Sequence, residues 1–162
     1  MIIADTGFWI ALFDRRDNHH QAVCDFFVTI KEPFITTLPV LTEVCYLLQT
    51  RCYPLKATDF LKAQQAGLFH LFTISEPHLL KMSQLMIQYV DLPMDLADAS
   101  LVLLAEELGH GRIVSTDRRD FNTYRWKNSE PFTSLVDILH NSEKFNGSAL
   151  PPAICCFANR AF

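Results

Sequence analysis

The sequence predicts an α/β protein with a central, mainly parallel sheet covered by helices. Two observations support this fold class: short apolar or β-branched runs recur along the chain, and stretches with helical periodicity separate them. The size sets the number of domains, since 162 residues with 49% hydrophobic side chains suit one ordinary domain with a real core. From about Asn141 the pattern dissolves, so we expect an irregular tail over 141–162, loosely attached or disordered.

Strands are predicted where apolar runs end in turn residues, and helices where apolar residues recur at helical spacing between capping signals. The predicted strands are 2–4, 33–38, 68–74, 112–116 and a weaker one at 131–136. The predicted helices are 17 to about 27, 39 to about 50, 58–66, 76–89, and one that Pro93-Met94-Asp95 opens and Gly109 ends. Asp5-Thr6-Gly7 is expected to form a turn.

Composition limits the function classes. A formal charge of −4 and a pI of about 5.8 lack the basic excess of domains that bind nucleic acid mainly through phosphates. That objection weakens if several acids form a metal site, because bound dications cancel their charge. The five cysteines form no CxxC or Cys/His ligand spacing, which argues against zinc. With no apolar run of roughly 20 residues and no signal-peptide pattern, we expect a cytoplasmic protein without membrane contact.

Two aspartates follow predicted strands. Asp5 comes after Ile2-Ile3-Ala4, and Asp117 comes after the strand that ends at Thr116. In open α/β sheets, ligands bind beyond the carboxyl ends of the strands, so both residues are candidate ligands. Each taken alone is better explained as a turn former or a helix cap.

Two further acids lie on helices. Glu43 falls on the border of an apolar stripe and should face partly inward, although its head could also reach water. Asp98 projects onto the apolar face of the following helix at 101, 104, 105 and 108, where a bare carboxylate needs a cation or several donors. Asp95, at the start of that helix, is explained as its N-cap, with a secondary or water-bridged role at the site left open.

Together these carboxylates are a hard oxygen-ligand set, suited to Mg²⁺ or Mn²⁺. For phosphodiester hydrolysis such an ion would activate a water and polarise the phosphoryl oxygens. Thr6 and Thr116, each beside a candidate ligand, could orient a water or a carboxylate, or could simply belong to strand-end turns.

Four segments, in this order, resemble the PIN-domain family and especially the VapC-type toxin ribonucleases of bacteria. They are Ile-Ile-Ala-Asp-Thr-Gly-Phe-Trp-Ile-Ala-Leu-Phe-Asp at 2–14, Thr-Glu-Val at 42–44, Asp-Leu-Ala-Asp-Ala-Ser-Leu at 95–101 and Ser-Thr-Asp-Arg-Arg-Asp-Phe at 115–121. The resemblance implies a nuclease domain over residues 1–140 with a three-layer α/β/α sandwich. It also implies that an acidic quartet binds Mg²⁺ or Mn²⁺ for RNA cleavage: Asp5, Glu43, Asp98 and Asp117.

The same resemblance implies frequent homodimers and a small antitoxin that covers the acidic pocket, so the leading hypothesis is a metal-dependent ribonuclease acting as a toxin. Asp120 also lies in a family-like context and is a candidate supporting residue. Arg15, Arg118 and Arg119 could contact RNA phosphates, or could be ordinary solvated charges. The alternative is a non-catalytic binding module with the same fold. A phosphatase is disfavoured because Gly7 stands where its second aspartate would be needed.

Overall fold

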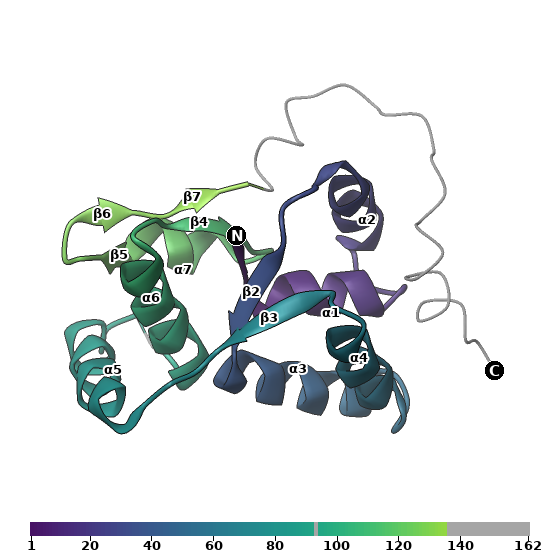
Figure 1. The fold of residues 1–162 in the computed structure, drawn as a ribbon, viewed down its shortest axis with the longest axis horizontal. Coiled ribbons are helices and arrows are strands. Elements are labelled where there is room, and N and C mark those ends of the chain that lie inside the picture. The colour runs from purple at the N-terminus through teal and green to yellow at the C-terminus, as the bar shows by residue number, and fades with distance from the viewer. Residues whose placement is uncertain (93, 136–162) are drawn as a thin grey trace.

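The central sheet of the computed structural model contains five parallel strands in the order β3-β2-β1-β4-β7 (Figure 1). The structure describes residues 1–92 and 94–135, except the side chains of Arg118 and Arg119, and the expected tail over 141–162 lies outside this range. The strands are β1 (Ile2–Ala4), β2 (Phe34–Thr37), β3 (Phe69–Phe72), β4 (Arg112–Val114) and β7 (Thr133–Ser134). All five match predicted strands, and none is longer than predicted.

Helices cover both faces of this sheet, which confirms the three-layer α/β/α fold. They are α1 (Thr6–Phe13), α2 (His20–Thr29), α3 (Leu38–Arg51), α4 (Lys56–Gln65), α5 (Glu76–Gln88), α6 (Leu96–Leu108) and α7 (Arg118–Thr123). Helices α5 and α6 lie on one side of the sheet, and α1, α2 and α4 lie on the other (Figure 1). Helix α3 packs against α1 and α4 and also against α6, so it brings the two layers together. In the described part of the chain, no helix is long and apolar enough to cross a membrane.

The prediction of a turn after Asp5 was wrong, because α1 begins at Thr6. Asp5 is in the extended conformation and its side chain accepts a hydrogen bond from the Thr6 backbone, which makes it the N-cap of α1. Every residue from Phe8 to Phe13 is buried. A helix buried on all sides shows no alternation of polar and apolar residues, and so its periodicity could not be detected in the sequence.

A cluster of aromatic side chains fixes α1 against the sheet. The Trp9 ring lies 4.9 Å from Phe69 of β3 and 5.7 Å from Phe34 of β2, measured between ring centroids. Phe60 of α4 stacks on Phe69 at 4.9 Å. Edge and offset aromatic contacts add to the free energy of burial, so α1 is held rigidly. The position of Asp5, at the start of α1, is therefore set by the core beneath it.

The chain after α6 forms two elements that were not predicted. Helix α7 follows β4 directly, and β5 (Arg125–Trp126) pairs with β6 (Glu130–Pro131) as a separate antiparallel hairpin. Lys127 and Asn128 turn this hairpin with positive φ angles of 47° and 64°. The hairpin lies beside α6, where the Lys127 backbone N–H donates to the Glu106 carboxylate at 3.0 Å.

Candidate active site

A cavity of about 350 Å³ lies where the carboxyl ends of β1 and β4 meet α3 and α6. Pairing of Ala4 with Val114 places Asp5 beside the end of β4, and the Asp5 backbone N–H donates to the Val114 carbonyl at 3.1 Å. Seven carboxylates are among the described residues that line the cavity: Asp5, Asp17, Glu43, Asp95, Asp98, Asp117 and Asp120. The fold therefore brings together six of the acids singled out in the sequence and adds Asp17.

Asp5 is the most deeply placed of these acids, at 7% exposure. One carboxylate oxygen accepts a hydrogen bond from the Thr6 backbone at 2.6 Å, and the other accepts one from the Ser115 hydroxyl at 2.7 Å. Burial raises the pKa of Asp5 to about 6, the Ser115 and Thr6 hydrogen bonds oppose this rise, and the charge of Glu43 adds to it. The Asp5 side chain is thus held in one orientation, yet its negative charge is poorly compensated.

Asp98 lies in the first turn of α6, where Asp95 is the N-cap and accepts the Asp98 backbone N–H at 2.9 Å. The capping role expected for Asp95 is confirmed. The hydroxyl of Tyr124, whose side chain is fully buried, donates to the Asp98 carboxylate at 3.0 Å. Burial and then the charges of Asp95 and Asp5 raise the pKa of Asp98 to about 7. Asp98 is a second carboxylate with unbalanced charge.

Glu43 is half-buried on α3, consistent with its expected position at the border of an apolar stripe. The Thr6 hydroxyl donates to a Glu43 carboxylate oxygen at 2.6 Å. Since the Thr6 backbone also donates to Asp5, this threonine orients two acids at once. Thr37 at the end of β2 is hydrogen-bonded to Ser100 of α6 at 2.6 Å, which ties α6 to the sheet.

Asp117 is exposed at the rim of the cavity, and it follows β4 as predicted. Its backbone N–H donates to the Ser115 hydroxyl at 2.9 Å, and its carboxylate accepts the Asp120 backbone N–H at 3.4 Å in the first turn of α7. Thr116 also lines the cavity and lies against Gly7: a Cβ at position 7 would be 2.1 Å from the Thr116 hydroxyl oxygen. Glycine is therefore needed for α1 to approach β4 this closely.

The sequence of this protein matches the PIN domain model over residues 2–127. The chain belongs to the PIN-domain family. Ribonuclease VapC26 of Mycobacterium tuberculosis is 26% identical over 124 residues, which are 76% of this chain and 92% of that protein. The crystal structure of Mycobacterium tuberculosis VapC20, titled a Sarcin-Ricin loop cleaving toxin, superimposes with a TM-score of 0.69. That alignment covers 74% of this chain and 92% of the other at 18% identity, and it supports the fold alone.

PIN domains are typically metal-dependent nucleases, and the lining of this cavity can be compared with that chemistry. The side chains offer hard carboxylate oxygens, which suit Mg²⁺ or Mn²⁺, and the charges of buried Asp5 and half-buried Asp98 call for a cation. In the described residues, however, no three His, Cys, Asp or Glu side chains are arranged to hold one ion. The cavity fits a divalent ion in the type of its donor atoms and in its negative charge. It suits an ion such as Mg²⁺, which keeps several waters and takes one or two protein carboxylates.

Basic side chains at the cavity of this PIN domain differ from those expected. Arg51, at the end of α3, lines the cavity, whereas exposed Arg15 is not among its described lining residues. The side chains of Arg118 and Arg119 lie outside what the structure describes. Sequence reasoning also missed Ser115 and Tyr124 as partners of Asp5 and Asp98. Ser115 could have been noticed because it immediately precedes Thr116-Asp117, but no local signal marks Tyr124.

Proposed function

We propose that this PIN domain is a metal-dependent ribonuclease whose divalent ion would be held by Asp5, Glu43, Asp98 and Asp117, directly or through the waters that such an ion keeps. The observation that carries the proposal is the gathering of these four acids with other carboxylates in one cavity, and the raised pKa values of Asp5 and Asp98 are consistent with it. Burying like charges together is costly unless a cation offsets them. Perturbed carboxylates in a cavity are also typical of catalytic sites.

When bound, Mg²⁺ or Mn²⁺ would supply Lewis-acid chemistry, lowering the pKa of a water and stabilising charge on the phosphoryl group. The chain's own residues hold the carboxylates in place. Ser115 and the Thr6 backbone fix Asp5, the Thr6 hydroxyl fixes Glu43, and Tyr124 fixes Asp98. Each of these acids keeps lone pairs for a ligand, because an ionised carboxylate has about four acceptor sites.

The remaining residues take supporting roles in this proposal. Asp95 and Asp120 add negative charge near the ion, and Thr116 shapes the wall next to Gly7. Arg51 is better placed than Arg15 to meet an RNA phosphate, and Arg118 and Arg119 keep their proposed RNA contacts as a hypothesis. Because the cavity repels phosphates when it holds no cation, we expect RNA binding itself to require the metal.

Cleavage of RNA in the presence of Mn²⁺ tests the proposal directly. The wild-type protein should cleave, Asp5→Asn should lose at least about 100-fold of the rate, and exposed Asp91→Asn is the matched control that should cleave normally. Cleavage that is unaffected by Asp5→Asn would contradict the assignment of Asp5. Circular dichroism of each purified protein checks that the substitution has not unfolded it.

We also propose that the protein is the toxin of a type II toxin–antitoxin pair and acts on RNA in the cytoplasm. The support is the resemblance of its four motif segments to VapC-type toxin ribonucleases, together with its similarity to Ribonuclease VapC26. A basic antitoxin segment would complement the acidic cavity. Induced expression should arrest bacterial growth, and Asp5→Asn should relieve the arrest. Wild-type expression without arrest would instead indicate a housekeeping nuclease.

We propose further that the nuclease domain extends over residues 1–140. The third part of the proposal is that the protein forms a homodimer. Large apolar side chains are exposed on and just after α5: Leu79, Leu80, Ile87 and Val90, at 56%, 68%, 70% and 71%. We infer that they form a patch together, which would mark a protein interface. Light scattering should give twice the chain mass, and Ile87→Glu should give the monomer mass. A monomeric wild type would contradict this part.

A non-catalytic PIN-like binding module is the alternative function. It is favoured by one observation, that no three candidate ligands among the described residues are arranged around a single ion. Titration calorimetry separates the two functions, since the ribonuclease must bind Mn²⁺ and the module need not. If Mn²⁺ binds neither to the wild type nor to Asp91→Asn at millimolar concentration, the binding module is the better account.

A further inference from the structure

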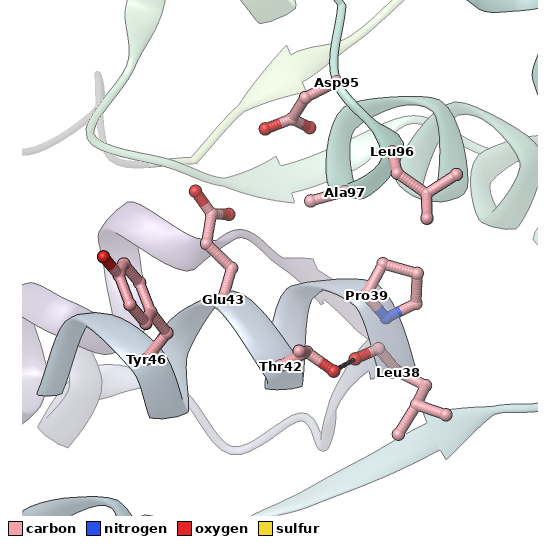
Figure 2. Close-up of a pocket in the computed structure, with 8 residues that line it drawn as sticks. All are labelled: Leu38, Pro39, Thr42, Glu43, Tyr46, Asp95, Leu96 and Ala97. Carbon is pink, nitrogen blue, oxygen red and sulfur yellow. Dashed lines mark hydrogen bonds between the residues drawn. The ribbon is translucent and has the colours of Figure 1, made fainter. Parts of the chain in front are cut away.

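An apolar groove of about 530 Å³ lies next to the acidic cavity, between α3 and the start of α6. Figure 2 shows Glu43 and Asp95 pointing toward each other across this groove. The same two residues also line the acidic cavity, so the two hollows adjoin each other. The described lining is otherwise apolar or uncharged: Leu38, Pro39, Thr42, Tyr46, Leu96 and Ala97. A strand of RNA with a phosphate at the acidic cavity would therefore have its neighbouring groups beside this groove.

Tyr46 is the distinctive residue of the groove. It is 64% exposed, although tyrosine has a large apolar ring that gains free energy on burial. Leu38 and Leu96 on the same groove are also exposed, at 59% and 49%. Exposed apolar side chains gathered at a concave site are typical of ligand-binding surfaces.

The spacing of Tyr46 and Glu43 matches the spacing of the base and the phosphate in a nucleotide. The two residues are three apart on α3, so their Cβ atoms are about 5–6 Å from each other on one side of the helix. Both residues line the groove, and in Figure 2 both side chains rise from the side of α3 that faces Asp95. A nucleotide likewise carries its base one ribose away from its phosphate. A phosphate near Glu43 therefore places the attached base within reach of the Tyr46 ring.

The chemistry of the groove selects a base over the other parts of RNA. No lysine or arginine is among its described lining residues, and its rim carries two carboxylates, so a phosphate is disfavoured there. Pro39 has no N–H to donate, and the Thr42 hydroxyl already donates to the Leu38 carbonyl at 2.9 Å. Such a surface can offer stacking and apolar contact, and little hydrogen-bond readout.

We propose that this groove binds the unstacked nucleobase next to the scissile phosphate, with Tyr46 as the stacking platform. The inference rests on the proposed ribonuclease function and adds a substrate subsite to it. Because stacking increases with ring area and reads few hydrogen bonds, the subsite accepts any base and prefers purines to pyrimidines.

The test measures the affinity of fluorescein-labelled hexaadenylate RNA for the full chain by anisotropy, with Ca²⁺ in place of Mn²⁺ to suppress cleavage. Tyr46→Ala should raise the Kd by about 5- to 150-fold, the range for loss of one base–aromatic stack. Tyr46→Phe should stay within about 2-fold of wild type, since the ring is kept. Leu61→Ala, which removes a 45% exposed apolar side chain on α4 away from the groove, is the matched control and should not change the Kd.

A second set of probes replaces one adenosine at a time with an abasic ribose. One abasic position should weaken binding to the wild type as much as Tyr46→Ala does, and should cost nothing further in Tyr46→Ala, because both changes remove the same contact. Equal abasic losses in both proteins would overturn the proposal. So would a change from dimer to monomer mass in Tyr46→Ala with its Kd unchanged, since the groove would then be an interface between two copies.

Failure of this subsite can be told apart from failure of the ribonuclease proposal. If the wild type cleaves RNA with Mn²⁺ and Asp5→Asn does not, but Tyr46→Ala binds hexaadenylate like the wild type, only the nucleobase subsite is rejected. If the wild type neither cleaves nor binds RNA, both proposals are rejected. Calorimetry should show the same Mn²⁺ affinity for Tyr46→Ala and wild type, and a loss would assign the weaker RNA binding to the metal site instead.

Discussion

Replacing Asp98 by Asn should stabilise the metal-free protein at pH 8 and change little at pH 4. The pKa of Asp98 rises from 3.8 to about 7 on folding, first because of burial and then because of the charges of Asp95 and Asp5. Between these two pH values the folded state binds more protons than the unfolded state, so stability falls as pH rises through this window. At 1.36 kcal/mol for each tenfold change in proton affinity, the full rise corresponds to roughly 4 kcal/mol.

The expected gain is smaller than that figure. Asp98 is partly exposed, so solvent screens part of its interaction with the other acids, and we expect roughly 2–3 kcal/mol at pH 8. Asn keeps the size of the side chain and an oxygen that can still accept the Tyr124 hydroxyl. Its effect should therefore come mainly from the missing charge.

Urea unfolding in EDTA, followed by circular dichroism at pH 4, 6 and 8, measures this effect. Wild type should lose stability over that range, Asp98→Asn should lose less, and Asp91→Asn should follow the wild type because Asp91 is exposed. Addition of Mn²⁺ at pH 8 should stabilise wild type more than Asp98→Asn. Equal stabilities of wild type and Asp98→Asn at pH 8 would refute the account of an uncompensated charge.

Three further substitutions test the structure around the site. Gly7→Ala should lower the free energy of unfolding by about 1–3 kcal/mol, because the new Cβ clashes with Thr116. In a Thr116→Ala background the same change should be neutral or stabilising, because alanine favours helix. Thermal melts that show the same sign in both backgrounds would contradict the clash. Tyr124→Phe keeps the ring but removes the donor to Asp98, and should lower stability at pH 8 by about 1–2 kcal/mol in urea titrations; a neutral effect would mean that the hydrogen bond is unimportant. Phe60→Ala should lower the free energy of unfolding, measured with guanidinium, by about 3–5 kcal/mol. A loss below about 1 kcal/mol would argue against the tight aromatic packing of the core.

The parts of the site that could be predicted from the sequence are local. Asp95 caps the helix that contains Asp98, and both positions follow from residues within one or two turns. Asp5 and Asp117 could be placed because strands and helices alternate, and this pattern implies a parallel sheet with its ligands at one edge. The segments that line the acidic cavity could thus be predicted, but the contacts between them could not.

What could not be predicted depends on contacts between distant residues or on burial from every side. Tyr124 reaches Asp98 across 26 positions, and a tyrosine near the end of a short helix carries no sign of such a partner. Helix α1 shows no periodicity because its residues are buried all round. The hairpin of β5 and β6 turns at Lys127 and Asn128, both with positive φ; asparagine tolerates this conformation, but lysine rarely adopts it, and the turn was not recognised.

The central position of β1 has a consequence for how the protein is made. β1 is the first strand of the chain, yet it pairs with β4, and the Ser115 to Asp5 hydrogen bond joins residues 110 positions apart. A nascent chain on the ribosome cannot complete this pairing until β4 has left the exit tunnel, so Asp5 lacks its second donor and its neighbour Asp117 until then. Products that stop before β4 carry Asp5, Glu43 and Asp98 without the strand that aligns them, and we expect them to be inactive. Synthesis through β4 would in this way be a condition for the proposed ribonuclease activity.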